Sequence, residues 1–189
     1  MNEIDIAHTA VVVIDVQKDY FLGGRFPLWK STKALKAVIK VVNEARKDNL
    51  PVIWIRHEGL SPKSTFLSAG TDGCSLHPSL PVFSGDAVIV KHEPDSFQDT
   101  ALDALLKEKG IETVIWMGMM TWMCVDTTVR AAFKMGYRNI LVTDATASGW
   151  LKDSKGLIFP WHTQRSFIAS LGAKFAAACV SRDWRKTLY

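Results

Sequence analysis

The chain has 189 residues and a mass of 21.0 kDa, with 48% hydrophobic and 22% charged residues. These values fit one globular domain with its own core, which we assign to residues 1–189. The net charge of +4 comes from dispersed basic residues interleaved with acids, which argues against a nucleic-acid partner. No apolar stretch reaches the roughly 18 residues of a membrane span, and no charged leader opens the chain, so we expect neither a membrane partner nor secretion.

The cysteines are three and scattered, at Cys74, Cys124 and Cys179. An odd number without a C-x-x-C pair gives neither a disulfide framework nor a metal-binding pattern. A reducing compartment suits such a chain, and we therefore expect a cytoplasmic protein.

Short β-branched runs alternate with amphipathic segments along the chain. The runs predict strands at residues 10–15, 51–55, 87–91, 113–117 and 139–143, with a possible sixth in "KFAAACV". Helices are predicted from an N-cap at Ser31, around residues 102–106, from near Cys124 to Gly136, and from about His162 to Leu171.

This alternation predicts a three-layer α/β/α fold, because near-continuous apolar strands are typical of a parallel sheet covered on both faces. Ligands of such sheets bind outside the carboxyl ends of the strands. The one long irregular stretch, residues 57–86, is a candidate lid or oligomer contact.

Three residues that can carry chemistry follow strands or open a helix. Asp15 and Lys91 end the first and third strands, and Cys124 lies where a helix begins. Each has an ordinary alternative: a strand-end carboxylate, a lysine that extends to water, and a buried cysteine that acts as a small apolar residue. A helix N-terminus favours thiolate over thiol, which makes Cys124 a candidate nucleophile.

Four spaced motifs resemble those of the isochorismatase-like cysteine hydrolases, which include nicotinamidases, N-carbamoylsarcosine amidases and isochorismatases. They are "VVVIDVQKDYF", "GCSLHPSL", "VIVKHEPDSFQDTALDALLKEKGI" and "GMMTWMCVDTTVRAAFKMGY". The resemblance covers nearly the whole chain. It implies a Rossmann-like, six-stranded parallel sheet of order 3-2-1-4-5-6, and a homo-oligomer, either a dimer or a tetramer.

The resemblance also implies roles for individual residues. Cys124 corresponds to the nucleophile, Asp15 to the general base, and Lys91 to the cation that links them. A cis peptide is implied at Met119–Met120, and the backbone N–H groups of Met120 and Cys124 would form an oxyanion hole. In the implied strand order the third strand lies about 9.6 Å from the first, so Lys91 has to lean across the second strand.

The chain departs from its relatives at the position where nicotinamidases hold a metal ion. Ile55 stands where their metal-binding aspartate would be, and only His57 of that pair remains. We therefore predict no metal and no other cofactor. His57, Gln17, Phe21 and the bulky Trp122 are candidates to line the substrate pocket.

These features predict a metal-independent amidase that cleaves the C–N bond of a small carboxamide or ureido compound through a thioester. Two alternatives stay open. The first is an isochorismatase-type hydrolysis of a vinyl ether, in which Asp15 protonates the substrate and Cys124 takes no part. The second is a non-catalytic thiol, acting in redox sensing or binding on the same scaffold.

Overall fold

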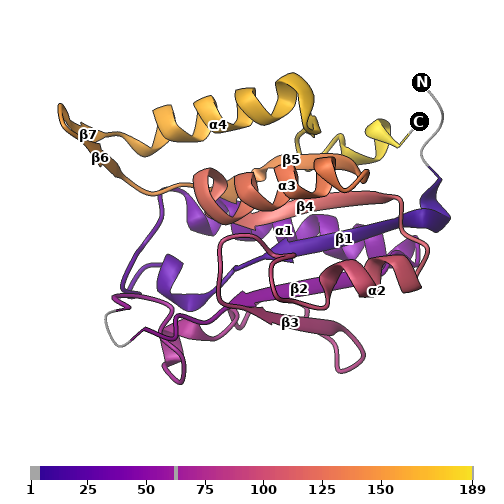
Figure 1. The fold of residues 1–189 in the computed structure, drawn as a ribbon, viewed down its shortest axis with the longest axis horizontal. Coiled ribbons are helices and arrows are strands. Elements are labelled where there is room, and N and C mark those ends of the chain that lie inside the picture. The colour runs from indigo at the N-terminus through magenta and orange to yellow at the C-terminus, as the bar shows by residue number, and fades with distance from the viewer. Residues whose placement is uncertain (1–4, 62–63, 189) are drawn as a thin grey trace.

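A six-stranded parallel sheet with helices on both faces forms the molecule in the computed structural model, which describes residues 5–61 and 64–188 (Figure 1). The strands are β1 (Thr9–Ile14), β2 (Val52–His57), β3 (Ala87–Lys91), β4 (Thr113–Met119), β5 (Arg138–Ala147) and β8 (Ala177–Cys179). Their order, β3-β2-β1-β4-β5-β8, confirms the predicted topology, with β8 as the sixth strand.

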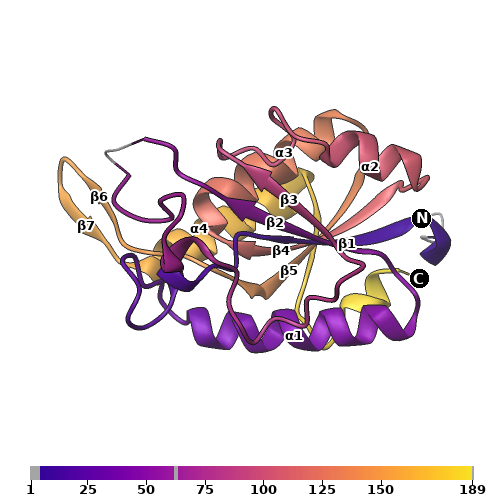
Figure 2. The same cartoon turned by 90° about the horizontal axis from the view of Figure 1, so that it is seen from below.

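The helices are α1 (Ser31–Lys47), α2 (Leu102–Glu108), α3 (Asp126–Lys134) and α4 (Pro160–Lys174). Figure 2 shows α1 on one side of the sheet and α2 and α3 on the other. None of the helices among the described residues combines the length and apolarity needed to cross a bilayer.

The strand pleat explains why both faces are covered. Successive residues of β1 point to opposite faces, so Val11 and Val13 pack in the core under α1, while Val12 and Ile14 pack in the core under α2 and α3. All four are at most 1% exposed. Burying one such side chain contributes about 1.5–3 kcal/mol, and a strand buried on both faces therefore reads as a continuous apolar run.

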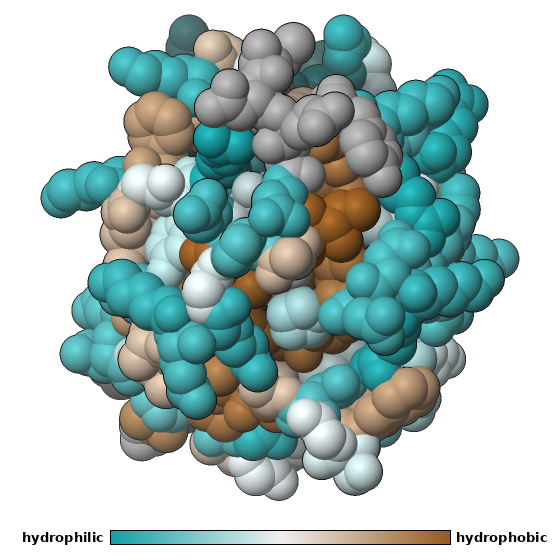
Figure 3. Space-filling model, turned by 90° about the vertical axis from the view of Figure 1, so that its right-hand side faces the viewer, coloured by the Kyte–Doolittle hydropathy of each residue, from teal (hydrophilic) through white to brown (hydrophobic). Residues whose placement is uncertain are grey.

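The two ends of the sheet differ in character. Figure 3 shows the face at the amino ends of the strands, which is mostly hydrophilic, with the most apolar surface near its middle. At the opposite end, the long loops after β1 and β2 gather around the carboxyl ends of the strands (Figure 1). Chemistry is therefore to be sought at this second end.

Two helix boundaries differ from the predicted ones. Ser31 is the first helical residue of α1, and Lys30, with a left-handed φ of 58°, takes the N-cap position without a capping side-chain bond. Helix α4 begins earlier, at Pro160, and passes through Gly172 to Lys174. Gly172 does not end this helix but packs closely against the sheet, since a Cβ there would lie 3.3 Å from that of Ala178 on β8.

The sequence pattern did not predict the antiparallel hairpin of β6 (Leu151–Asp153) and β7 (Gly156–Ile158). Three-residue strands are too short to show an alternating pattern. The hairpin projects from the body of the molecule beyond the start of α4 (Figure 1).

Candidate active site

The carboxyl end of β1 places Asp15. This residue follows the strand directly and has a left-handed φ of 51°, a conformation that aspartate tolerates better than most residues. The neighbouring strand approaches closely at Gly118, where a Cβ would lie 1.9 Å from the Ile14 carbonyl oxygen. Glycine is therefore required there, and it brings the ends of β1 and β4 together.

Lys91 lies at the centre of a buried cluster. Its Nζ is 2.8 Å from Asp15 Oδ2 and 3.3 Å from Cys124 Sγ. The same ammonium lies 3.0 Å from the Glu93 carbonyl oxygen and 3.2 Å from His57 Nδ1. A lysine ammonium has three N–H bonds, and here it is surrounded by four polar neighbours. These contacts fix its position. Lys91 thus spans the width of β2, as the strand order requires.

Asp15 is fully buried, yet neither of its carboxylate oxygens has a well-oriented hydrogen-bond donor among the described residues. Its Oδ2 lies 2.8 Å from the Lys91 ammonium, with which it forms a buried ion pair. A purely structural carboxylate is usually held by backbone N–H groups. None of these groups in the described part of the chain donates to Asp15. The lone pairs of Asp15 therefore remain available to accept a proton.

Cys124 lies within a single π-helical turn, Thr121–Val125, that precedes α3. Such turns are frequent at functional sites. The expectation that the helix N-terminus would favour thiolate is not met: burial first, and then the negative charge of Asp15, raise the pKa of the Cys124 thiol to about 12, although Lys91 acts in the opposite direction. Cys124 therefore rests as a thiol.

The Lys91 ammonium keeps its charge at neutral pH. Burial acts to lower its pKa, but the negative charge of Asp15 outweighs burial and raises it. His57 shows the opposite shift, since burial and the Lys91 charge lower its pKa. A neutral His57 can accept a hydrogen bond from Lys91 through Nδ1.

Gln17 holds the end of β2 next to the site through its side-chain amide. Its Nε2 donates to the carbonyl oxygens of His57 (2.8 Å) and Cys74 (2.6 Å), and its Oε1 accepts from the His57 N–H (2.8 Å). The side chain is fully buried. Its amide is thus occupied in joining β2 to the loop that follows it.

The two aromatic candidates occupy different places. Phe21 is buried and packs its ring against His77, with centroids 4.3 Å apart, so it braces the loop after β2. Trp122 lies on the π turn two residues before Cys124. Its indole N–H is buried and has no acceptor in the described part of the chain.

The peptide bond between Met119 and Met120 is cis, as predicted. The Met120 carbonyl accepts from the N–H groups of Met123 and Val125, which closes the π turn. The Met120 N–H itself donates to no other group among the described residues. It is therefore available to a ligand at the start of the nucleophile turn.

Ile55 is fully buried in the core between the sheet and α2 and α3. This is the position that the family resemblance relates to the metal-binding aspartate of nicotinamidases. Within residues 5–61 and 64–188, no three His, Cys, Asp or Glu side chains group in a way that could hold a metal ion. The absence of a metal remains a prediction.

Two residues near the site, Tyr20 and Gln164, were not predicted from the sequence. Tyr20 is 1% exposed, and burial together with the charges of Cys124 and Asp15 raises the pKa of its phenol, which places it close to the cluster. The short 3-10 helix Lys18–Tyr20 turns it inward, and sequence alone does not distinguish it from Phe21. Gln164, which bonds to Thr121 of the π turn, is 43 residues distant in sequence and gave no signal.

Comparison with known proteins agrees with this geometry. The Isochorismatase domain model matches residues 9–155. YddQ, an uncharacterized isochorismatase family protein of Bacillus subtilis (strain 168), is 34% identical over 178 residues, which cover 94% of this chain and 99% of YddQ.

Two solved structures are similar. An isochorismatase from Pseudomonas putida KT2440 has a TM-score of 0.88 and 30% identity, covering 97% of this chain and 93% of its own. An N-carbamoylsarcosine amidase from Thermoplasma acidophilum has a TM-score of 0.78 and 25% identity, covering 92% and 96%. The chain belongs to the isochorismatase family of hydrolases.

Proposed function

We propose that the protein is a metal-independent amidase that hydrolyses a C–N bond of a small carboxamide or ureido compound through a Cys124 thioester. The observation that carries this proposal is the position of Lys91 Nζ, 2.8 Å from Asp15 Oδ2 and 3.3 Å from Cys124 Sγ in a buried cluster. Nucleophile, base and linking cation thereby meet at one point.

The first step is attack on the substrate carbonyl. Because Cys124 rests as a thiol, its proton has to leave as sulfur attacks, and Asp15 is the neighbouring group whose lone pairs are free. The Lys91 ammonium stabilises the negative charge that passes between them. The N–H groups of Met120 and Cys124 are proposed to receive the developing oxyanion.

The second step expels the amine. The tetrahedral intermediate collapses to a thioester, the C–N bond breaks, and Asp15 returns its proton to the leaving nitrogen. In the third step Asp15 removes a proton from water, which attacks the thioester and releases a carboxylic acid and the Cys124 thiol. A urea-type substrate would release a carbamic acid in the same way. The similar amidase from Thermoplasma acidophilum supports C–N cleavage.

The test is a screen for ammonia release from a library of small carboxamides and ureido compounds. We expect at least one compound to be turned over by the wild type and not by the Cys124→Ala variant. A Cys179→Ala variant is the matched control, because that cysteine lies on β8, away from Lys91. Equal ammonia release by Cys124→Ala would contradict the thioester route, and the vinyl-ether alternative predicts ammonia release from none of the compounds.

The same screen tests the prediction of a metal-free reaction. Activity should survive exhaustive dialysis against EDTA, since Ile55 replaces the metal-binding carboxylate. Loss of activity that zinc restores would contradict this prediction. Oxidation of Cys124 without turnover of any compound would instead support the thiol sensor.

We also propose that the protein is a homo-oligomer and that the β6–β7 hairpin contributes to its interface. A two-stranded hairpin outside the main sheet has little stability of its own in water. Apolar side chains on and beside this hairpin are nevertheless exposed: Trp150, Leu157, Phe159 and Trp161. A second copy would cover them. Light scattering should give a dimer or tetramer, reduced to a smaller species by Leu157→Asp; a monomeric wild type would contradict the proposal.

A further inference from the structure

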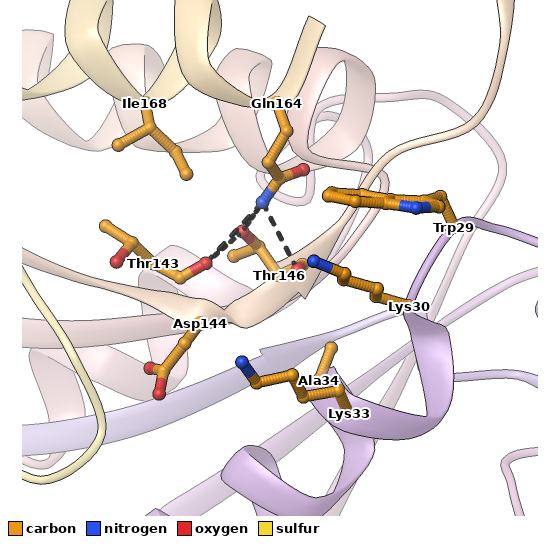
Figure 4. Close-up of a pocket in the computed structure, with 9 residues that line it drawn as sticks. All are labelled: Trp29, Lys30, Lys33, Ala34, Thr143, Asp144, Thr146, Gln164 and Ile168. Atoms are coloured by element: carbon orange, nitrogen blue, oxygen red, sulfur yellow. Dashed lines mark hydrogen bonds between the residues drawn. The ribbon is translucent and has the colours of Figure 1, made fainter. Parts of the chain in front are cut away.

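A cavity of about 230 Å³ lies between the start of α1, the carboxyl end of β5 and α4 (Figure 4). This volume is large enough for a small molecule. Neither Asp15, Lys91 nor Cys124 lines it. The apolar part of its wall comes from Trp29, Ala34 and Ile168.

The cavity carries positive charge. Lys30 and Lys33 extend toward it from α1 (Figure 4), and neither has a carboxylate within ion-pair distance in the described part of the chain. Lys30 Nζ lies 4.0 Å from the centre of the Trp29 ring, which holds it at the wall. Asp144 also lines the cavity, but its two oxygens accept hydrogen bonds from the N–H and hydroxyl of Ser181. Two ammonium groups thus face one carboxylate whose oxygens are directed to Ser181, and the cavity wall carries a net positive charge.

Gln164 connects the cavity to the nucleophile turn. Its Nε2 donates to Thr146 Oγ1 (2.7 Å) at the cavity wall (Figure 4). Its Oε1 accepts from the hydroxyls of Thr121 (2.7 Å) and Ser148 (2.6 Å). Thr121 is the first residue of the π turn that carries Cys124. A group that displaces the Gln164 amide would therefore alter the support of that turn.

We propose that this cavity binds a small organic carboxylate and that its occupancy is transmitted to the Cys124 turn through Gln164. The two ammonium groups would bind the carboxylate, and the apolar wall would contact its hydrocarbon part. The regulatory role of this cavity rests on the proposed function. Amide hydrolysis releases a carboxylate, so the reaction product belongs to the class of ligand that the cavity would bind. Product bound there would then regulate the enzyme.

Binding is tested with benzoate and the Cys124→Ala protein, so that no reaction is needed. Calorimetric titration should give saturable binding, weakened at least about tenfold in a Lys30→Met/Lys33→Met double variant. Lys36→Met is the matched control, because Lys36 is exposed on the same helix but outside the cavity. Benzyl alcohol, which lacks the charge, should bind more weakly than benzoate. Equal benzoate affinity in the double variant, or no binding at all, would overturn the site.

Transmission is tested separately by hydrogen exchange of the backbone amides in Thr121–Val125. Benzoate should change their exchange rates several-fold in the Cys124→Ala protein and leave them unchanged in the double-lysine variant. Saturable binding with no change in this turn would overturn the coupling through Gln164. Neither experiment depends on turnover, so failure of the proposed amidase activity would be seen independently in the ammonia screen.

Discussion

Two buried carboxylates stand four residues apart in the same loop and are held in opposite ways. Asp15 is fully buried, with no well-oriented hydrogen-bond donor among the described residues, and it contacts the Lys91 ammonium. Asp19 is 2% exposed and accepts from the backbone N–H groups of Arg25 (3.1 Å) and Leu67 (2.6 Å).

The difference separates the proposed proton acceptor from a carboxylate used for structure. Asp19 ties the loop after β1 to the loop after β2, and the fit is close: a Cβ on Gly73 would lie 2.1 Å from Asp19 Oδ1. Its oxygens are occupied by amides. Asp15 receives no backbone N–H among the described residues, and its Oδ2 lies 2.8 Å from the buried Lys91 ammonium, an arrangement that suits a proton acceptor.

Replacing Asp15 should give the largest effect on activity. Asn keeps the size of the side chain but cannot accept and return a proton, and positioned acid–base catalysis is typically worth about 10²–10⁴-fold. We expect Asp15→Asn to lower kcat/KM by that factor, measured on the amide found by the screen. Circular dichroism serves as the folding control. A folded variant that retains more than about half of the activity would make Asp15 structural, like Asp19.

Replacing Lys91 should affect both stability and activity. Lys91→Met leaves Asp15 as an unpaired buried charge, and breaking a buried pair typically costs about 3–5 kcal/mol of unfolding free energy. Adding Asp15→Asn should restore part of this stability in urea denaturation, because the orphaned charge is gone. Activity should stay lost in the double variant. Additive stability effects in this cycle would argue against a direct interaction.

Replacing Asp19 should reverse the pattern seen at Asp15. In Asp19→Asn one backbone N–H faces an NH₂ group in place of an acceptor, which costs about 1–3 kcal/mol. We expect a lower unfolding free energy and faster proteolysis of the loop after β2. The residual folded enzyme should keep its kcat. A loss of kcat with unchanged stability would mean that Asp19, too, takes part in the reaction.

The smallest expected effect is on pH dependence. With a pKa near 12, Cys124 stays protonated across the neutral and mildly alkaline range, so kcat/KM should not rise as the pH passes the ordinary thiol pKa of about 9.0. The unfolded thiol ionises from about 9.0. The folded state therefore keeps the Cys124 proton to a higher pH than the unfolded state. The stability that this proton contributes is complete below about pH 9.0 and is lost as the pH rises toward 12. The measurement compares wild type with Cys124→Ala in urea at about pH 8 and pH 10.5.

The strands were predictable from a local signal, whereas the joint roles of Asp15, Lys91 and Cys124 came from the family resemblance. Apolar runs mark buried strands, and Asp15 and Lys91 follow such runs directly. The strand order came from family resemblance and not from the pattern itself. What the sequence does not carry is side-chain environment: the burial of Cys124, which raises its pKa, depends on packing from several elements.

Long-range polar contacts were equally hidden. Gln17 looks like a pocket residue in its motif, yet its amide is fully used by His57 and Cys74 across the loop. Gln164 lies in α4, whose sequence shows little separation of apolar and polar faces. It contacts Thr121, which is 43 residues distant in sequence, only once the chain has folded. Contacts between residues that are distant in sequence produce no periodic pattern, so the three-dimensional structure is needed to identify them.

The central claim is that burial, together with the charge of Asp15, keeps Cys124 as a thiol at rest, and that Asp15 takes its proton during attack. It is tested most directly by measuring alkylation and turnover in the same Asp15→Asn protein, with Cys74 and Cys179 replaced by serine. Removing the Asp15 charge should lower the thiol pKa, so iodoacetamide should label Cys124 faster at about pH 8, while kcat/KM falls by about 10²–10⁴. Faster labelling together with undiminished turnover would contradict the account.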